Sequence, residues 1–363
     1  MKKNQVVILL LLCATMAGMT GCSGKAEAGA VGNAKEVLAS ETNAGQQQET
    51  LSKAEVNSSQ TYTKTMKNTE FNSEVQSQES LDVYKTKAEK ITFDKARLEK
   101  ALGKTISDGE SEEQEEGWFL ADSEGIRFAT KLGEHIANSV DLDARDGNLD
   151  KYEKDGELSF MSKQEAYEKV LAQLKDMGID VGDAAYTSYA LDYETMKAQE
   201  FVMDEDGSQM EEYKKKDWKL EDDCYLFLIR QKVQEIPEYH VYGNVFVRME
   251  EGNAPIQVCY SKNGIESMEI ENVFRFTQEE EALDLLEFDK ITESVVKELE
   301  NRDDTSSYQV TSAQFCFMTP KFGSEMTPVW VFQSEETTTE GDHYPVTVVI
   351  NAQNGKLQAI GTR

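Results

Sequence analysis

The pattern of apolar and polar positions in the middle of the chain predicts one helix followed by strands. A capping box of Ser162 and Glu165 opens the helix, Gly178 follows its last residue, Met177, and four apolar residues share one face: Tyr167, Val170, Leu171 and Leu174. Strand-like runs follow at Ala184 to Tyr193, Cys224 to Val233, Tyr239 to Met249, Ile256 to Tyr260 and Ile265 to Phe276. The last two meet at Asn263-Gly264, a strong hairpin signal.

The C-terminal part of the chain shows the same order of patterns. Thr277 and Glu280 form a second predicted capping box before a helical stretch through Leu286, and a further helix starts at Asp289. Its apolar face carries Ile291, Val295 and Leu299. Strand-like runs then cover Tyr308 to Met318, Val329 to Ser334 and Val346 to Ile350, and Asn354-Gly355 predicts the closing hairpin. The acidic, lysine-containing insertion Glu194 to Asp222 accounts for much of the greater length of the first unit.

A smaller pattern precedes the two units. It contains a helix near Asp94 to Leu102, ended by Gly103, and a hairpin of Trp118 to Ala121 with Ile126 to Thr130. Because helices precede runs of antiparallel strands without βαβ alternation, the sequence predicts an α+β fold of tandem modules, each with a capped helix packed on an antiparallel sheet. The expected boundaries are 86–160 for a small N-terminal module, 161–276 for module 1 with the insertion 194–222, and 277–363 for module 2.

The N-terminus carries the pattern of an export signal. Lys2 and Lys3 precede a continuous apolar run from Val6 to Met16, about 11 residues, whereas a membrane-spanning helix needs roughly 20. The following Met19-Thr20-Gly21-Cys22 resembles the lipobox of bacterial lipoproteins, with Met19 in place of the usual Leu. This resemblance implies cleavage before Cys22 and a diacylglycerol thioether on it, and two acyl chains give stable anchoring. An ordinary secretory signal with an incidental cysteine is the alternative.

From Cys22 to about residue 85 the chain is rich in Ser, Thr, Gln, Glu and Asn and poor in large apolar residues. Such a segment buries too little apolar surface to offset the entropy of ordering. The sequence therefore predicts a signal peptide at 1–21 and a lipidated, disordered stalk at 22–85, which holds the folded part at the outer face of the cell membrane.

The formal net charge of -30, from 68 acidic and 38 basic residues, argues against nucleic acid as a partner and against direct docking on anionic lipid headgroups. Membrane attachment is therefore expected through the lipid at Cys22. The cysteines of the expected folded part, Cys224, Cys259 and Cys316, each lie in an apolar run. Free, buried thiols are expected, with a single disulfide as the alternative.

Few residues offer catalysis or cofactor binding. The histidines are His135, His240 and His343, none lies near a Gly-x-Ser-x-Gly elbow, and no pair of Cys or His has the spacing of a zinc motif. The sequence also contains no glycine-rich nucleotide-binding loop. It therefore predicts a protein that is not an enzyme and that needs no cofactor.

Clustered carboxylates beside Gly147 are the candidate ligands for a metal ion, namely Asp141, Asp143 and Asp146. Their spacing fails the EF-hand pattern, because Arg145 falls on a ligand position when Asp141 is the first ligand. A solvated acidic turn is the favoured interpretation, and a weak Ca²⁺ site is the alternative.

Two tryptophans suggest different roles. Trp330, in Pro-Val-Trp-Val-Phe, is typical of a core strand, whereas Trp218 stands among lysines in the insertion and is expected to be exposed. An exposed aromatic residue beside cations suits the anchoring of a protein partner. We therefore predict a partner-binding surface on the insertion, with Trp218 as its anchor.

The tandem units have starts such as Ser162-Lys-Gln-Glu-Ala-Tyr and the end Val346-Thr-Val-Val-Ile-Asn-Ala-Gln-Asn-Gly-Lys356. In these features they resemble PepSY-like domains, and they are similar to the extracytoplasmic regulators of the cell-wall-sensing histidine kinase in low-GC Gram-positive bacteria. The resemblance covers about residues 160–363. It implies a mostly non-catalytic family whose members restrain peptidases or sensor proteins, and it carries over no catalytic residue.

These patterns predict a non-catalytic, lipid-anchored extracytoplasmic protein that binds and regulates another protein of the cell envelope. A ligand- or solute-binding lipoprotein of a transporter is the main alternative, and it would require a deep cleft between two lobes with parallel sheets. A cell-wall hydrolase is a further alternative, and it would require a cleft lined by polar residues with strongly shifted pKa values.

Overall fold

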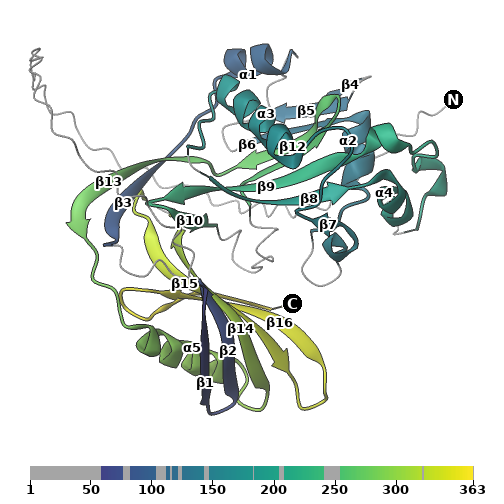
Figure 1. Ribbon diagram of the computed structural model, residues 1–363. Helices are drawn as coiled ribbons and strands as arrows, with labels where there is room; N and C mark the ends of the chain where they lie inside the picture. Colours follow the sequence, from purple (N-terminus) through teal and green to yellow (C-terminus); the bar gives the residue numbers. More distant parts are fainter. Residues whose placement is uncertain are drawn as a thin grey trace, which may run out of the picture. The chain divides into compact units, whose positions relative to one another are not determined.

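The computed structural model describes residues 59–76, 82–103, 112–114, 117–121, 125–142, 147–182, 184–203, 208–240, 254–320 and 323–362. Within these ranges the chain forms an α+β fold, as predicted, and most strands belong to one large mixed sheet (Figure 1). No helix in these ranges is both long enough and apolar enough to cross a membrane.

The first set of elements is a helix with four antiparallel strands in sequence order. It consists of α3 (Lys163–Asp176), β8 (Ala184–Leu191), β9 (Cys224–Val233), β11 (Ile256–Ser261) and β12 (Gly264–Glu271). The Ser162 side chain accepts from the backbone N–H of Glu165 at 3.3 Å, so the predicted N-cap is confirmed. Gly264 has φ 111°, the left-handed conformation for which the Asn263-Gly264 turn needs glycine.

Further strands extend this part of the sheet on both sides. The strand β7 (Glu153–Lys154) pairs with β8, while β6 (Gly125–Thr130), β5 (Gly117–Ala121) and β4 (Glu112–Gln114) continue in that order beyond β12. The pairing of β5 with β6 confirms the predicted hairpin. The predicted helix before it is confirmed as α1 (Lys95–Leu102), which Gly103 ends.

Helices cover both faces of this part of the sheet. Along β9, Tyr225 and Phe227 belong to the core shared with α3 and α1, and the alternate residue Leu226 belongs to the core on the opposite face. That second core includes residues of α2 (Lys131–Ala137) and α4 (Tyr193–Gln199). The helix α2 approaches β12 so closely that a Cβ at Gly133 would lie 2.1 Å from the carbonyl oxygen of Glu266.

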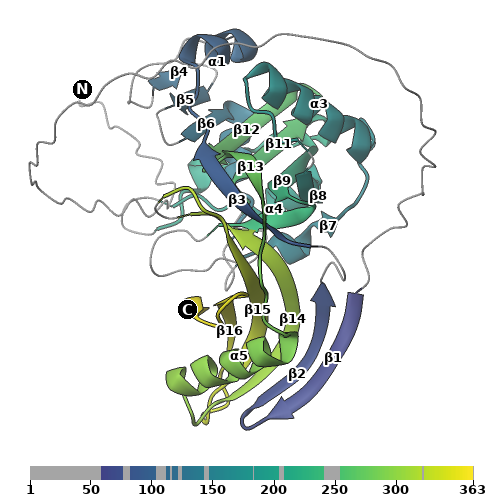
Figure 2. The same cartoon turned by 90° about the vertical axis from the view of Figure 1, so that its left-hand side faces the viewer.

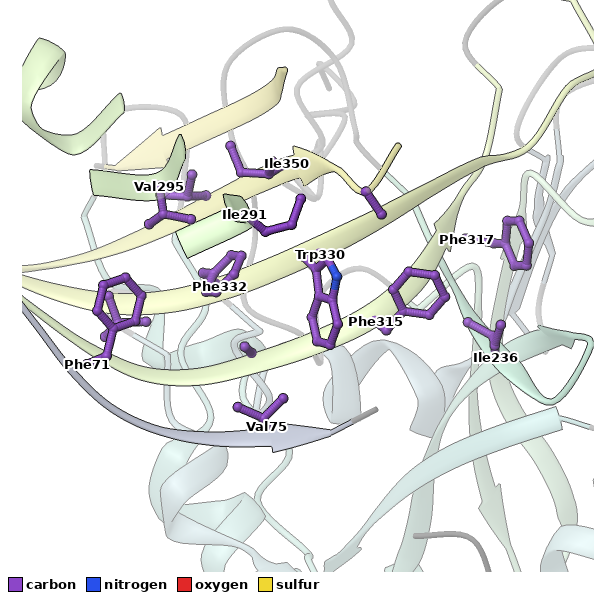
Figure 3. Close-up of a cluster of buried hydrophobic side chains, with 14 of the residues drawn as sticks. Phe71, Val75, Ile236, Ile291, Val295, Phe315, Phe317, Trp330, Phe332 and Ile350 are labelled. Carbon is purple, nitrogen blue, oxygen red and sulfur yellow. The ribbon is translucent and has the colours of Figure 1, made fainter. Parts of the chain in front are cut away.

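The second set repeats the order of a helix and four sequential antiparallel strands. It consists of α5 (Phe288–Arg302), β14 (Ser307–Met318), β15 (Thr327–Thr337), β16 (His343–Asn351) and β17 (Leu357–Thr362). Ile291 and Val295 of α5 share a core with Trp330, Phe332 and Ile350 of the sheet (Figure 3). Full burial of one such side chain contributes roughly 1.5–3 kcal/mol, which holds α5 on the sheet.

The N-terminal end of the described chain corrects the predicted stalk. Residues 59–76 form a hairpin of β1 (Ser59–Met66) and β2 (Thr69–Gln76), and β2 runs parallel to β14. Phe71 and Val75 are buried in the core that α5 covers (Figure 3). The apolar residues of this segment are few, but within each strand they are four positions apart, so one face of the hairpin collects them. The predicted signal peptide, Cys22 and the stalk up to residue 58 lie outside the described residues.

The helix predicted from Thr277 to Leu286 is also wrong. Residues up to Ala282 belong to β13 (Phe274–Ala282), which pairs antiparallel with β3 (Tyr84–Lys90) (Figure 2). Phe274 is buried in the core that α5 covers, and Phe276 packs against the same core. The two residues are two positions apart, which is the spacing that places side chains on one face of a strand. Backbone pairing with β3 therefore outweighs the local capping signal.

The predicted antiparallel sheets are part of one mixed sheet. The short strand β10 (Ile236–Tyr239) pairs antiparallel with β9 and parallel with β14. Hydrogen bonds therefore run from the first set of strands into the second. Most of the run predicted as a strand from Tyr239 to Met249 lies outside the described residues.

Candidate functional site

Carboxylates hold the insertion where it leaves and rejoins the sheet. The Asp192 side chain accepts from the backbone N–H of Thr195 at 2.9 Å and caps α4, and Asp223 Oδ1 accepts from the N–H of Tyr193 at 2.8 Å. In the described part of the insertion beyond α4, helical structure is limited to the single 3₁₀ turns η2 (Glu211–Tyr213) and η3 (Leu220–Asp222). The insertion is thus an irregular loop with short helical pieces.

Glu200 lies at the centre of this loop. Its side chain is buried, and its oxygens accept from the backbone N–H of Lys215 at 3.1 and 3.0 Å and from the indole N–H of Trp218 at 2.9 Å. The Nδ1 atom of His135, on α2, lies 2.7 Å from Glu200 Oε1. One carboxylate therefore joins α2, the end of α4 and the segment before β9.

The hydrogen bonds keep Glu200 ionised. Burial acts to raise the pKa of Glu200, but hydrogen bonds from His135, Trp218 and Lys215 together lower it below its ordinary value. An ionised carboxylate only accepts hydrogen bonds, so Nδ1 of His135 is the donor in this contact. The contact thus orients a partly exposed imidazole and fastens the loop to α2.

Trp218 is buried, which corrects the prediction of an exposed anchor. Its side chain is 7% exposed and belongs to the same core as Met196 of α4, and the His135 ring meets it edge-on at 6.4 Å. The Lys215 ammonium lies 5.8 Å from the indole centroid. The neighbouring lysines were misleading because the acceptor for the indole N–H, Glu200, is 18 residues away in the sequence.

Other large apolar side chains of the insertion are exposed instead. Phe201 is 48% exposed, Tyr213 is 41% exposed and Leu220 is 59% exposed. Phe201 directly follows Glu200, and Leu220 begins η3, which contacts α4. Sequence reasoning missed these residues because composition does not show which side chains of an irregular loop meet the core.

The predicted calcium ligands are only partly described. The backbone N–H of Asp141 donates at 2.8 Å to Oδ1 of Asn148, which precedes the 3₁₀ turn η1 (Leu149–Lys151). Asp143 and Asp146 lie outside the described residues. Among the residues that are described, no three metal-ligating side chains form a group that could hold an ion. The calcium hypothesis therefore stays a prediction.

The histidines lie in separate environments. His240 is hydrogen-bonded through Nδ1 to Thr319 Oγ1 at 2.7 Å and through Nε2 to Asn272 Nδ2 at 3.0 Å. Burial lowers the pKa of His240 to about 4, so the ring is neutral at pH 7. His343 is exposed beside Glu335 at 2.9 Å, and His135 belongs to the insertion site.

The cysteines behave as predicted. Cys224, Cys259 and Cys316 are free and buried.

Comparison with known proteins gives a fold relationship. The chain is similar to an uncharacterized protein from Eubacterium rectale ATCC 33656, whose crystal structure was determined at 1.45 Å resolution. The TM-score is 0.53, the identity is 16%, and the match covers 80% of this chain and 91% of that chain. At this identity the likeness concerns the fold alone. A scan against models of protein families and a search of curated proteins found no match.

Proposed function

We propose that this chain is a lipid-anchored extracytoplasmic protein that binds and regulates another protein of the cell envelope, without being an enzyme. The proposed anchor is Cys22, where two acyl chains would hold the mature chain at the outer face of the cell membrane. The net charge of -30 disfavours nucleic acid and anionic headgroups, which leaves a protein as the favoured class of partner.

The order of the elements supports a PepSY-like character. A helix followed by four neighbouring antiparallel strands occurs from α3 to β12, with α4 and β10 inserted between the strands, and again from α5 to β17. In each set the helix shares its core with the second and third strands, through Phe227 and Val258 in the first set and through Phe332 and Val348 in the second. We propose that the two sets are tandem PepSY-like modules, which by this likeness would restrain a partner rather than catalyse a reaction.

The observation that carries the proposal is the exposure of Phe201, Tyr213 and Leu220 on one segment. Full burial of such a side chain contributes roughly 1.5–3 kcal/mol, so a partner that covers these half-exposed side chains would gain part of that energy. The buried Glu200 fixes the backbone beside them. A surface held in place before binding loses less entropy on association, which favours a specific partner.

Capture from membranes tests the proposed surface. The full-length chain, tagged at its C-terminus and extracted in mild detergent, should retain an envelope protein that mass spectrometry identifies. We expect the triple variant Phe201→Ser, Tyr213→Ser and Leu220→Ser to lose at least about 90% of that capture, since a loss of 1.4 kcal/mol is already tenfold. Leu285→Ser is the matched control, because Leu285 is 39% exposed outside the insertion.

The outcomes separate the surface from the general function. Equal capture by the triple variant, with an unchanged melting temperature, would reject the insertion as the binding surface. If the wild-type chain retains no envelope protein above the level of an untagged strain, the binding function itself is wrong.

The anchor has its own test. Cys22→Ala removes the proposed attachment point of the acyl chains, so labelling with a fatty-acid analogue should fall to background and the chain should leave the membrane fraction. Continued labelling of this variant would contradict lipidation at Cys22.

A further inference from the structure

Two of the free cysteines lie beside each other in the sheet. Cys224, the first residue of β9, pairs with Ser261, and Cys259 of the adjacent β11 pairs with Leu226. The cysteines are therefore diagonal neighbours, two positions apart in the register. Both belong to the core on the face that carries α2 and α4, so their side chains point the same way from the sheet.

The two thiols lie on the same face of the sheet and are not equivalent. Burial raises the pKa of Cys224, whereas the hydrogen bond from Cys224, followed by that from Ser267, lowers the pKa of Cys259. Cys224 therefore keeps its proton and donates it, and Cys259 is the sulfur that more readily becomes a thiolate.

We propose that Cys224 and Cys259 form an oxidisable dithiol that closes to an intramolecular disulfide on reaction with a peroxide. The Cys259 thiolate attacks one oxygen of hydrogen peroxide and breaks the O–O bond. Cys259 becomes a sulfenic acid, and the other oxygen leaves as water after taking up a proton. The Cys224 sulfur, as it loses its proton, then attacks the sulfenic sulfur, which forms the S–S bond and releases a second water. In sum, two thiols and one hydrogen peroxide give one disulfide and two waters, with two electrons passing from sulfur to oxygen.

The strand geometry permits closure with a small movement. Diagonal neighbours in an antiparallel pair have Cα atoms about 7–8 Å apart, and a disulfide needs about 6.8 Å or less. Cys224 is the first residue of β9, where it pairs with Leu191 of β8 and Ser261 of β11, so closure needs a shift only at this end of the ladder. The dithiol chemistry does not depend on the proposed partner binding.

Differential alkylation of the full chain tests the dithiol. Trypsin places the cysteines on separate peptides, residues 220–230, 249–262 and 303–321. After peroxide treatment, free thiols are blocked with iodoacetamide under denaturing conditions, and the protein is then reduced and labelled with N-ethylmaleimide. We expect Cys224 and Cys259 to acquire the second label in equal fractions, and the unreduced digest to contain their two peptides joined and lighter by two hydrogen atoms.

Cys316 is the matched control, because it is buried to a similar degree in another core. It should keep the first label. In Cys224→Ala the sulfenic acid on Cys259 has no resolving thiol, so dimedone should trap it, whereas Cys259→Ala should leave Cys224 unmodified. The proposal is wrong if both thiols stay reduced while an added reference thiol is fully oxidised, or if the cross-link involves Cys316. The wild-type peptide map alone decides this, even if a variant fails to fold.

Discussion

Glu238 is a residue whose protonation couples to folding. Its side chain is 1% exposed on β10, where Oε1 accepts from the backbone N–H of Gln231 at 2.9 Å. Within the described part of the chain Oε2 has no hydrogen-bond partner. Burial raises the pKa of Glu238 to about 8, although that hydrogen bond and the charge of Arg230 both act to lower it. The neutral acid is therefore the stable form in the folded protein at pH 7.

This shift gives a pH dependence of known sign. Between its ordinary pKa of 4.5 and about 8, folded Glu238 holds a proton that the unfolded chain has released. Its stabilising contribution is thus fully present below pH 4.5 and is lost as the pH rises through 8. Glu238→Gln cannot titrate, so we expect the variant to gain stability relative to the wild type from pH 6.5 to 8, by up to about 1.4 kcal/mol per pH unit.

Urea denaturation of both proteins across this window measures the difference. Burial lowers the pKa of His240 from 6.5 to about 4, so this histidine changes the stability only between those two pH values. The window from pH 6.5 to 8 lies above that range. Parallel stability curves for the two proteins would mean that Glu238 is already ionised when folded.

Trp218 shows which part of the site could not be predicted from the sequence. The acidic, lysine-containing composition was enough to identify the insertion. The lysines around Trp218 suggested that its side chain is exposed, but the structure buries it against Glu200. Local charge describes only the neighbours along the chain. The position of a side chain in an irregular loop depends instead on which distant acceptor satisfies its polar atoms, and no periodicity encodes that pairing.

At the scale of elements, the β1–β2 hairpin shows how a weak pattern becomes a strand. The core that α5 covers receives side chains from both strands of the hairpin: Tyr62 and Met66 from β1, and Phe71 and Val75 from β2. The other residues of the two strands are polar. Average composition therefore predicted disorder, although the even spacing of these apolar residues within each strand places them on one face. The hairpin gains its backbone partner from β14, more than 200 residues away, which composition cannot reveal.

Phe71→Ala distinguishes a packed hairpin from a disordered stalk. Phe71 is 1% exposed in the core that α5 covers, so we expect the substitution to lower the free energy of unfolding by about 3–5 kcal/mol. Asn72→Ala is the control, because the exposed neighbouring residue should change it by less than about 0.5 kcal/mol. Calorimetry or denaturation of the full chain decides between the two descriptions, since a stalk residue would leave the transition unchanged.

The helix predicted at Thr277 failed for a related reason. A capping box is a local signal worth about 1 kcal/mol, whereas β13 gains a ladder of backbone hydrogen bonds with β3 and places Phe274 in the core. Where caps and periodicity agreed, as in α3, the prediction was right to within a residue or two.

At the scale of the whole described fold, the order of elements was predictable and the joining of the strands was not. The connection depends on the four residues of β10, which place Glu238 beside Phe317 in parallel register. Polar side chains reinforce it: the Gln231 amide bonds both backbone groups of Phe274, and the Gln234 amide bonds both backbone groups of Tyr84. These contacts bring together segments far apart in sequence, and no repeat in the sequence specifies their register.

Because hydrogen bonds continue through β10, the two sets of elements should unfold together. Hydrogen exchange followed by mass spectrometry measures this on β9 and β15, whose central residues Phe227 and Phe332 are fully buried in different cores. If opening is shared, Phe71→Ala, which disturbs only the core of α5, should lower the free energy of exchange of the slowest amides in both strands by the same amount. If the sets opened independently, β15 would lose protection while β9 kept it. The hydrogen bonds of the four-residue strand β10 would then be too few to couple the unfolding of the two cores. Gln231 and Gln234 would in that case only position β13 and β3.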